Sequence, residues 1–124
     1  MKFLVDTCGW IEWITAGSLA NKFEPYFKQS EKLVIPTILQ FELYRWLCRE
    51  RDETLAIESI GVTEQSLVAP ADTMLVLLAA DLAKQYDLAM ADAIIYATSR
   101  IYHAALITSD KHFQGLPEVT YFSK

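Results

Sequence analysis

Residues 1–10, MKFLVDTCGW, decide the fold class of this chain, because an apolar run from Phe3 to Val5 ends abruptly at the carboxylate of Asp6. Three apolar residues in succession, without helical spacing, predict a short buried strand. A carboxylate at the edge of a core is costly unless another interaction replaces its lost hydration. Asp6 therefore predicts either a hydrogen-bonded cap or a bound cation at the end of this strand.

The rest of the chain alternates between short apolar runs and helical patterns. The apolar runs predict strands over residues 2–5, 33–35, 67–69, 105–108 and 119–122, the last at a sheet edge. The helical patterns predict helices over residues 10–15, 19–28, 38–51, 72–86 and 91–103, with Thr37 as a capping residue and a polar connection around Gly61. This alternation predicts a single α/β domain over residues 1–124, with a mainly parallel central sheet flanked by helices.

The composition supports a compact domain. Apolar residues make up 52% of the 124 residues, and there are only four glycines and four prolines. No apolar run approaches the length of about 18 residues that a membrane span requires. Only three apolar residues separate Lys2 from Asp6, so we expect no secretion signal and a cytoplasmic protein. In that compartment Cys8 and Cys48 are expected to stay reduced.

The net charge of −5 argues against a protein that holds nucleic acid through a uniformly basic face, because lysine and arginine supply most of the affinity for phosphates. It does not exclude a nucleic-acid substrate. Carboxylates that converge on divalent cations turn an acidic site into a neutral or cationic one. Two such ions would change the net charge from −5 to −1.

Four acidic residues are placed where an open parallel sheet presents its functional crevice. Asp6 ends the first strand, and Asp110 closely follows the strand at 105–108. Glu42 lies among apolar residues in the opening turns of one predicted helix, and Asp92 lies near the start of another. The carboxyl ends of parallel strands and the starts of the following helices face the same rim. All four carboxylates are therefore expected to converge.

Carboxylates packed together repel one another and raise one another's pKa values when no cation is present. Mg²⁺ and Mn²⁺ prefer oxygen ligands and relieve this repulsion. A pair of such ions activates a water and stabilises the leaving oxygen during phosphodiester hydrolysis. The pattern therefore indicates metal-dependent hydrolysis at a site without a nucleophilic serine, cysteine or histidine.

Each acid also has a structural interpretation, and none identifies a site by itself. Asp6 would cap the following turn. Asp92 would interact with the dipole of its own helix, and Asp110 would be an ordinary turn residue. Glu42 would pair with Arg45, three residues on. The joint placement of the four acids favours a shared site.

With these positions identified, the sequence resembles a PIN-domain ribonuclease and, within that family, the small VapC-type toxins of toxin-antitoxin pairs. The matching features are Asp6-Thr7 after the first strand, Glu42 in the helix after Pro36, the segment ADAIIYATS at 91–99 and LITSDKHF at 106–113. The resemblance covers nearly the whole chain. It implies a PIN-like nuclease domain and an Mg²⁺- or Mn²⁺-dependent endoribonuclease that is the toxin of a type II toxin-antitoxin system.

The resemblance also implies roles for individual residues. Four carboxylates would hold the cations and carry catalysis, those of Asp6, Glu42, Asp92 and Asp110. Hydrogen bonds from Thr7 and Thr108 would support these ligands. The resemblance further implies a cognate antitoxin that occupies the active-site groove, and a homodimer. Cys8 departs from the family, which commonly carries serine at this position.

Candidate RNA contacts are less specific in the sequence. Arg45 and Arg49 share a helix flank with Glu42, and Lys111 adjoins Asp110, so these three basic residues are candidates to contact phosphate. Solvated charges that balance the nearby acids are an equally good interpretation. Aromatic residues spaced like Trp10, Trp13 and Trp46 are more typical of a core or an interface than of base stacking. His103 and His112 are expected at the surface, because the expected mechanism requires no imidazole.

Three other functions are weighed against this one. A phosphatase with an aspartyl nucleophile, as in haloacid-dehalogenase-like enzymes, needs a second aspartate two residues after the first, where this chain has Cys8. A stand-alone PIN nuclease in RNA processing would share the same four acids. A non-catalytic RNA-binding or assembly module of the same fold is disfavoured, because an inactive relative tolerates the loss of at least one acid.

Overall fold

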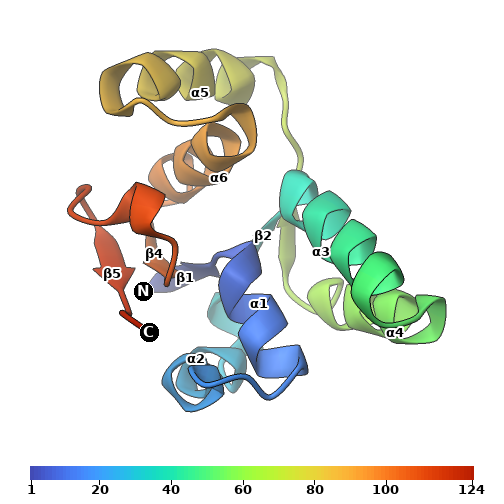
Figure 1. The fold of residues 1–124 in the computed structure, drawn as a ribbon. Helices are drawn as coiled ribbons and strands as arrows, with labels where there is room; N and C mark the ends of the chain where they lie inside the picture. The colour runs from blue at the N-terminus through green and yellow to red at the C-terminus, as the bar shows by residue number, and fades with distance from the viewer.

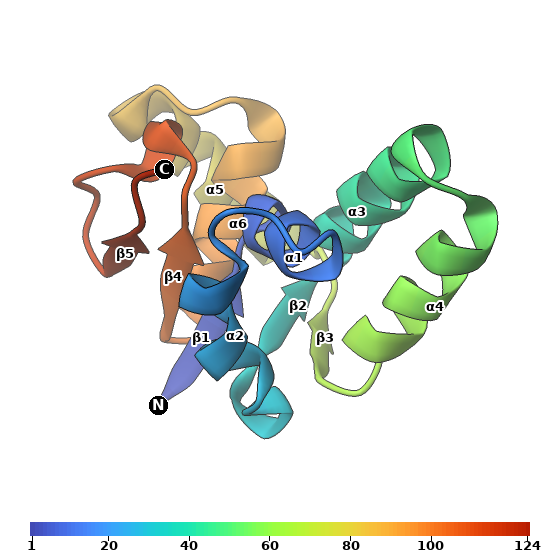
Figure 2. The ribbon, with the colours of Figure 1, turned by 60° about the horizontal axis from the view of Figure 1, so that its bottom comes forward.

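The N-terminal apolar run forms the strand β1 (Lys2–Val5), and four more strands follow along the chain: β2 (Val34–Pro36), β3 (Leu67–Ala69), β4 (Ala104–Thr108) and β5 (Val119–Tyr121). The computed structural model describes all residues from 1 to 124. β1 pairs with β4, β4 with β5 and β2 with β3, all in parallel. A bridge between Phe3 and Leu33 joins the two groups in the order β3-β2-β1-β4-β5, which Figure 2 shows side by side.

The strands are surrounded by the helices α1 (Thr7–Ile14), α2 (Ala20–Phe27), α3 (Thr37–Glu50), α4 (Glu53–Thr63), α5 (Thr73–Tyr86) and α6 (Met90–Ile101). Two short 3-10 helices, η1 (Ser30–Lys32) and η2 (Lys111–Phe113), complete the chain. α1 and α2 lie on one side of the strands, α5 and α6 on the other, and the α3–α4 pair lies beyond β2 and β3 (Figure 1). The predicted α/β class with a parallel sheet is confirmed. None of the helices combines the length and apolar character needed to cross a membrane.

The strand register fixes where the candidate site forms. Val5 of β1 pairs with Ile107 of β4, so the carboxyl ends of these two strands lie side by side. The backbone N–H of Asp6 extends the ladder by donating to the carbonyl oxygen of Ile107 at 3.0 Å. Asp6, which follows β1, and Thr108, the last residue of β4, are therefore neighbours although 102 positions separate them in sequence.

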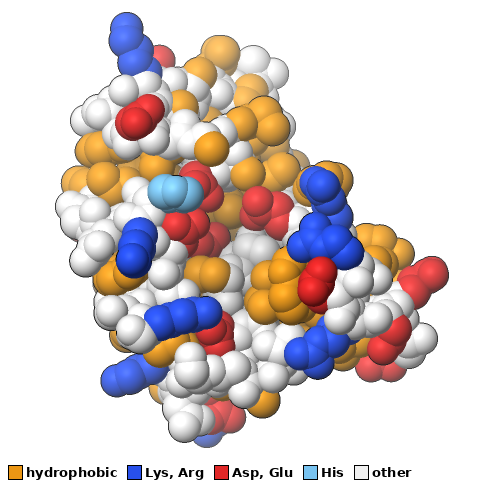
Figure 3. Space-filling view, viewed as in Figure 1, with side chains coloured by type: hydrophobic (Ala, Val, Ile, Leu, Met, Phe, Trp, Pro, Cys, Tyr) orange, Lys and Arg blue, Asp and Glu red, His pale blue; other side chains and the backbone are white.

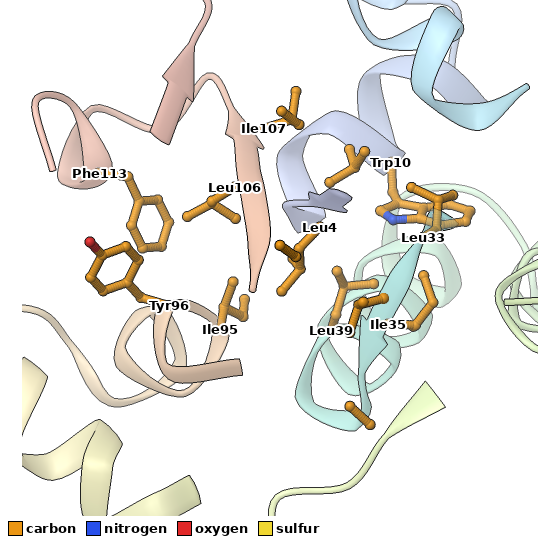
Figure 4. Close-up of a cluster of buried hydrophobic side chains, with 14 of the residues drawn as sticks. Leu4, Trp10, Leu33, Ile35, Leu39, Ile95, Tyr96, Leu106, Ile107 and Phe113 are labelled. Atoms are coloured by element: carbon orange, nitrogen blue, oxygen red, sulfur yellow. The ribbon is translucent and has the colours of Figure 1, made fainter. Parts of the chain in front are cut away.

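The core lies on both sides of the central strands. Leu4 of β1 and Leu106 of β4 are fully buried, and Figure 4 shows them between side chains from α3 and α6. α3 buries one stripe at the expected helical spacing, formed by Leu39, Leu43 and Leu47. A well-packed sheet of this kind holds the ends of its strands rigidly.

Two of the three tryptophans belong to the core and its edge rather than to an RNA-binding surface. Trp10 is 1% exposed and packs edge-on against Phe27 with ring centroids 4.6 Å apart. Trp13 stacks on the same Phe27 ring at 4.2 Å. Their i, i+3 spacing on α1 thus serves packing, as that spacing predicts.

The polar connection predicted around Gly61 is wrong, because residues 53–63 form the helix α4. Asp52 caps it by accepting a hydrogen bond from the N–H of Leu55 at 2.8 Å. α4 packs against α3 through its small and polar residues Ala56, Ser59 and Thr63. Ile57 and Val62 of α4 are exposed, and only Leu55 among its larger apolar residues packs against the core, so the sequence lacks the usual apolar stripe of a helix.

Two predicted helix starts also differ from the structure. α1 begins at Thr7 rather than at residue 10, because Asp6 caps it directly after the strand. Thr37 was predicted to cap α3, but Pro36 is the capping residue and no side chain caps this helix. Pro36 is also the last residue of β2, so Thr37 already has helical backbone angles and cannot cap.

Candidate functional site

Asp6 is held at the end of β1 by hydrogen bonds from Thr7, Thr108 and Cys8 and is only 3% exposed. Its Oδ1 accepts a hydrogen bond from the backbone N–H of Thr7 at 2.7 Å. Its Oδ2 accepts one from the hydroxyl of Thr108 at 2.9 Å. Asp6 therefore caps α1 and, with the same carboxylate, faces the end of β4, so the structural and the functional interpretations of this residue are compatible.

Thr108 connects the two acids that follow the parallel strands. Its hydroxyl donates to Asp6 and accepts a hydrogen bond from the backbone N–H of Asp110 at 2.9 Å. Thr108 is fully buried, which leaves its hydroxyl no other partner than these groups and the nearby thiol of Cys8. This hydrogen bond to Asp6 is the one that the sequence resemblance implied.

The other two acids come from helices, as the sequence predicts. Glu42 lies in the second turn of α3, and its Oε1 accepts a hydrogen bond from the hydroxyl of Thr7 at 2.7 Å. Asp92 lies in the first turn of α6 and is partly exposed. Thr7 thus ties the carboxylate of Glu42 to the helix that Asp6 caps. Glu42 has no ion pair with Arg45, so that structural alternative does not hold.

All four predicted acids line one open cleft of about 540 Å³. Figure 3 shows acidic side chains gathered near the middle of one face, beside a histidine, with basic side chains further out. Thr7, Cys8, Arg45 and Arg49 also line the cleft, whereas Lys111 is exposed and outside its lining. The remaining walls are apolar and come from Ile11, Ile38, Phe41, Trp46, Met90 and Ala91.

More acidic than basic side chains line the cleft. Burial, together with the smaller effect of the charges of Asp110 and Asp92, raises the pKa of Asp6 to about 7 against the lowering effect of its hydrogen bonds with Thr108 and Thr7. Burial first, and then neighbouring carboxylates, also raise the pKa values of Glu42 and Asp92. No lysine or arginine forms an ion pair with any of the four acids.

Cys8 lies between the ends of β1 and β4. Its thiol donates to Oδ2 of Asp6 at 3.5 Å and accepts from the backbone N–H and the hydroxyl of Ser109 at 3.4 and 3.3 Å. Burial, followed by the charge of Asp6, raises the pKa of this thiol to about 11. Cys8 therefore stays protonated and acts as a weak hydrogen-bond donor to the buried carboxylate.

One site residue was missed by the sequence interpretation. His112 is exposed, as predicted, but its Nδ1 lies 3.1 Å from Oδ2 of Asp92 and 3.2 Å from Oδ1 of Asp110. The signal in the sequence was that His112 follows Asp110 by only two residues. That spacing does not show that η2 turns the chain so that the imidazole approaches both Asp110 and Asp92. In the structure the turn is held by the N–H of His112, which donates to Oδ1 of Asp110 at 2.9 Å.

The donor set of this cleft is suited to a divalent cation. It offers four carboxylates, two of them bound by threonine hydroxyls from neighbouring elements. The imidazole of His112 is not part of the lining but contacts Asp92 and Asp110. Oxygen donors of this kind favour Mg²⁺, Ca²⁺ or Mn²⁺. Burial first, and then neighbouring carboxylates, raise the pKa values of Asp6, Glu42 and Asp92, and the charge of such an ion would act in the opposite direction.

Solved structures share this fold over nearly the whole chain. A chain in a toxin-antitoxin complex from Klebsiella pneumoniae has a TM-score of 0.83 at 21% identity, covering 99% of this chain and 100% of that chain. DNA-bound VapBC from Salmonella typhimurium gives 0.77 at 15% identity, with coverage of 99% and 98%. VapC20 from Mycobacterium tuberculosis, a toxin that cleaves the sarcin-ricin loop, gives 0.74 at 14% identity, with coverage of 98% and 90%.

At these identities the structural matches show a common fold and nothing finer. No curated protein matches the sequence. The sequence does match the PIN domain family over residues 3–119, a span that includes all four acids of the cleft. Sequence and fold therefore agree, and the chain belongs to the PIN-domain family.

Proposed function

We propose that residues 1–124 form one PIN-like nuclease domain, a metal-dependent endoribonuclease that acts in the cytoplasm as the toxin of a type II toxin-antitoxin system. The observation that carries this proposal is the convergence of Asp6, Glu42, Asp92 and Asp110 in one cleft without a lysine or arginine partner. Membership of the PIN-domain family supports it. The toxins among the structures of similar fold favour the toxin role.

The cofactor proposed for this site is Mg²⁺ or Mn²⁺, held by the same four carboxylates, which would also be the catalytic residues. A bound divalent cation supplies Lewis acidity, which makes water a better nucleophile and neutralises charge on the phosphate. The protein's own contribution is orientation. The hydroxyl of Thr108 donates a hydrogen bond to one oxygen of Asp6, and the hydroxyl of Thr7 donates one to an oxygen of Glu42. These hydrogen bonds fix the orientation of both carboxylates in the cleft.

The proposed substrate is RNA, whose phosphates would be contacted by the basic residues near the cleft. Arg45 and Arg49 line the cleft on the flank of α3. Arg49 also pairs with Glu50 at 3.0 Å, an exposed contact that is easily exchanged for phosphate. Lys111 lies outside the lining and would contact the strand beyond the scissile bond. Phosphate contacts of this kind position RNA without reading its sequence.

The proposed protein partners are an antitoxin and a second copy of this chain. Structures of similar fold were solved as toxin-antitoxin complexes. A homodimer is supported by apolar surface on α5 and at the start of α6, where Met74, Leu77 and Met90 are 75%, 63% and 72% exposed. Met90 also lines an apolar hollow of about 420 Å³ between these two helices. Leu77→Glu is expected to shift the chain from dimer to monomer in light scattering, and an unchanged mass would refute this interface.

The function is tested with the purified chain, free of any antitoxin, and a structured RNA. Cleavage is expected with Mg²⁺ or Mn²⁺ and not with a chelator. Asp6→Asn should be inert, whereas Asp81→Asn, on the exposed surface of α5, should cleave like the wild type. Equal cleavage by the wild type and Asp6→Asn would refute the proposed catalytic site. RNA binding without cleavage by either protein would favour the non-catalytic module.

The toxin role is tested in cells, separately from the chemistry. Expression of the chain should arrest growth, and co-expression of a short neighbouring gene that encodes a DNA-binding protein with a flexible tail should restore it. A chain that cleaves RNA in vitro but arrests no growth would favour the stand-alone PIN nuclease.

A further inference from the structure

His112 is brought to the cleft by its backbone and not by the packing of its ring. The N–H of His112 donates to Oδ1 of Asp110 at 2.9 Å, which makes Asp110 the cap of η2. The next residue, Phe113, is fully buried and lies against Tyr96 with ring centroids 6.3 Å apart. Asp110 and Phe113, which lie before and after His112 in this turn, are thus anchored, while the side chain of His112 is 71% exposed.

The hydrogen-bond and ion-pair contacts of the imidazole are with two acids of the cleft. Its Nδ1 lies 3.1 Å from Oδ2 of Asp92 and 3.2 Å from Oδ1 of Asp110. One donor atom from each of these three residues lies within 4.8 Å of the other two. Ligands at right angles around one small cation, each at about 2.1 Å, are about 3.0 Å apart. The three atoms therefore have the spacing that a shared cation requires.

A purely structural role explains this contact poorly. An ion pair with so exposed a histidine contributes little to folding. The turn is already fixed by the cap at Asp110 and by the buried Phe113, so the ring is not needed to form it. What the ring adds to the cleft is a nitrogen donor among oxygen donors.

We propose that Nδ1 of His112 is a ligand of the divalent cation together with Asp92 and Asp110, and that this nitrogen makes the site prefer Mn²⁺ over Mg²⁺. The physical reason is that imidazole is a good ligand for transition metals, whereas Mg²⁺ is held by oxygen and keeps much of its water. The inference rests on the proposed metal-dependent function and deepens it by naming the class of cation. Asp6 and Glu42 line the same cleft and offer oxygen only.

The test measures metal binding without RNA, by calorimetric titration of the wild type and His112→Gln with Mn²⁺ and with Mg²⁺. We expect the Mn²⁺ affinity of the variant to fall by roughly tenfold or more, because losing a group that merely orients a ligand already costs about that much. The Mg²⁺ affinity should change little, so the ratio of the two affinities should fall. His103→Asn is the matched control: His103 is exposed and has a φ of 52°, which asparagine tolerates.

Pulsed EPR of bound Mn²⁺ provides the direct measurement. The wild type and the His103→Asn control should show coupling of the Mn²⁺ electron spin to a ¹⁴N nucleus, and His112→Gln should lose it. Absence of this coupling in the wild type, or an equal loss of affinity for both cations in the variant, would overturn the inference.

Because no RNA is present, failure of the inference and failure of the proposed function are distinguishable. A chain that cleaves RNA without nitrogen coupling refutes the inference alone. A chain with nitrogen coupling that cleaves no RNA refutes the proposed activity alone. A chain that binds neither cation refutes both.

Discussion

Replacing Asp6 with asparagine is expected to stabilise the cation-free protein at pH 8 while abolishing its activity. The reason is the environment of this carboxylate, which is 3% exposed and has a pKa raised to about 7 from an ordinary value of 3.8. Burial is the largest cause, and the hydrogen bonds from Thr108 and Thr7 offset only part of it. Ionising Asp6 in the folded chain is therefore costly, and asparagine cannot ionise.

The sign and size of the effect follow from linkage. Between pH 4 and pH 7 the folded chain keeps the Asp6 proton that the unfolded chain has already lost, so stability falls as the pH rises through this range. The difference between 3.8 and about 7 corresponds to about 4 kcal/mol at pH 8. Asparagine avoids this cost but loses one acceptor for the hydroxyl of Thr108 or the thiol of Cys8, which costs about 1 kcal/mol. We therefore expect a net gain of about 3 kcal/mol.

The assay is urea unfolding in the presence of a chelator at several pH values from 4.5 to 8. Glu42 and Asp92 also have raised pKa values and give both proteins some pH dependence in the same direction. The difference between the two curves isolates Asp6. It should be near zero or slightly negative at pH 4.5 and grow to a few kcal/mol at pH 8. Asp81→Asn should run parallel to the wild type throughout.

Adding Mn²⁺ at pH 8 should reverse the order of the two proteins. A ligand that binds only the folded chain stabilises it by about 4.1 kcal/mol at a thousand times its dissociation constant, which exceeds the variant's advantage of about 3 kcal/mol. The wild type should gain this stability, and Asp6→Asn should gain much less. Wild-type and variant curves that stay parallel from pH 4.5 to pH 8 without metal would refute the argument, because Asp6 would then be as well solvated folded as unfolded.

Three other predictions concern the contacts around the site, the packing of α1 and the RNA path. Thr108→Val removes the hydroxyl bonded to Asp6 and should weaken Mn²⁺ binding by roughly tenfold in calorimetry, whereas Thr108→Ser should not; equal affinities would contradict the role given to this hydroxyl. Gly9→Ala places a Cβ 2.5 Å from Cγ1 of Val5 and should cost about 1 to 3 kcal/mol in urea unfolding, while Gly61→Ala on open α4 surface should gain about 0.5 to 1 kcal/mol; equal effects would show that α1 can shift. Arg45→Gln should weaken RNA binding and lower the slope of log affinity against log salt by about 0.7; an unchanged slope would place Arg45 off the RNA path.

The parts of the fold that the sequence predicts are those where local pattern and burial agree. β1 and β4 are continuous apolar runs because both faces of a central parallel strand are covered, and such runs are visible without any alignment. α3 buries one face, so its buried residues recur at helical spacing and are visible in the sequence as well. α4 was missed because its inner face is small and polar: Ser59 and Thr63 face α3, while Ile57 and Val62 face outward. Tertiary packing overrides the pattern there.

The candidate site divides in the same way. The four acids could be placed because each stands next to a predicted strand or at the start of a predicted helix, and parallel topology brings those points together. The contacts of Cys8 and His112 could not be placed, because they depend on the course of the chain after β4. Cys8 meets Ser109 across the strand ends, and His112 turns back toward Asp92 through η2. One-residue steps in a turn change such contacts completely.

The burial of Asp6 at the end of a strand explains why a carboxylate lies at the edge of the core. A carboxylate on a mobile loop would be well hydrated, would have an ordinary pKa and would gain little by binding a cation. At the end of a buried strand Asp6 is poorly hydrated, and Thr7 N–H, the Thr108 hydroxyl and the Cys8 thiol hold it without neutralising it. Because the ionised carboxylate is poorly hydrated, it destabilises the cation-free protein and gains free energy when a cation binds. The affinity for the cation and the lower stability without it therefore have the same structural cause. A variant that lowers the pKa of Asp6, such as one that introduces a lysine beside it, should therefore gain stability without metal and lose cation affinity together.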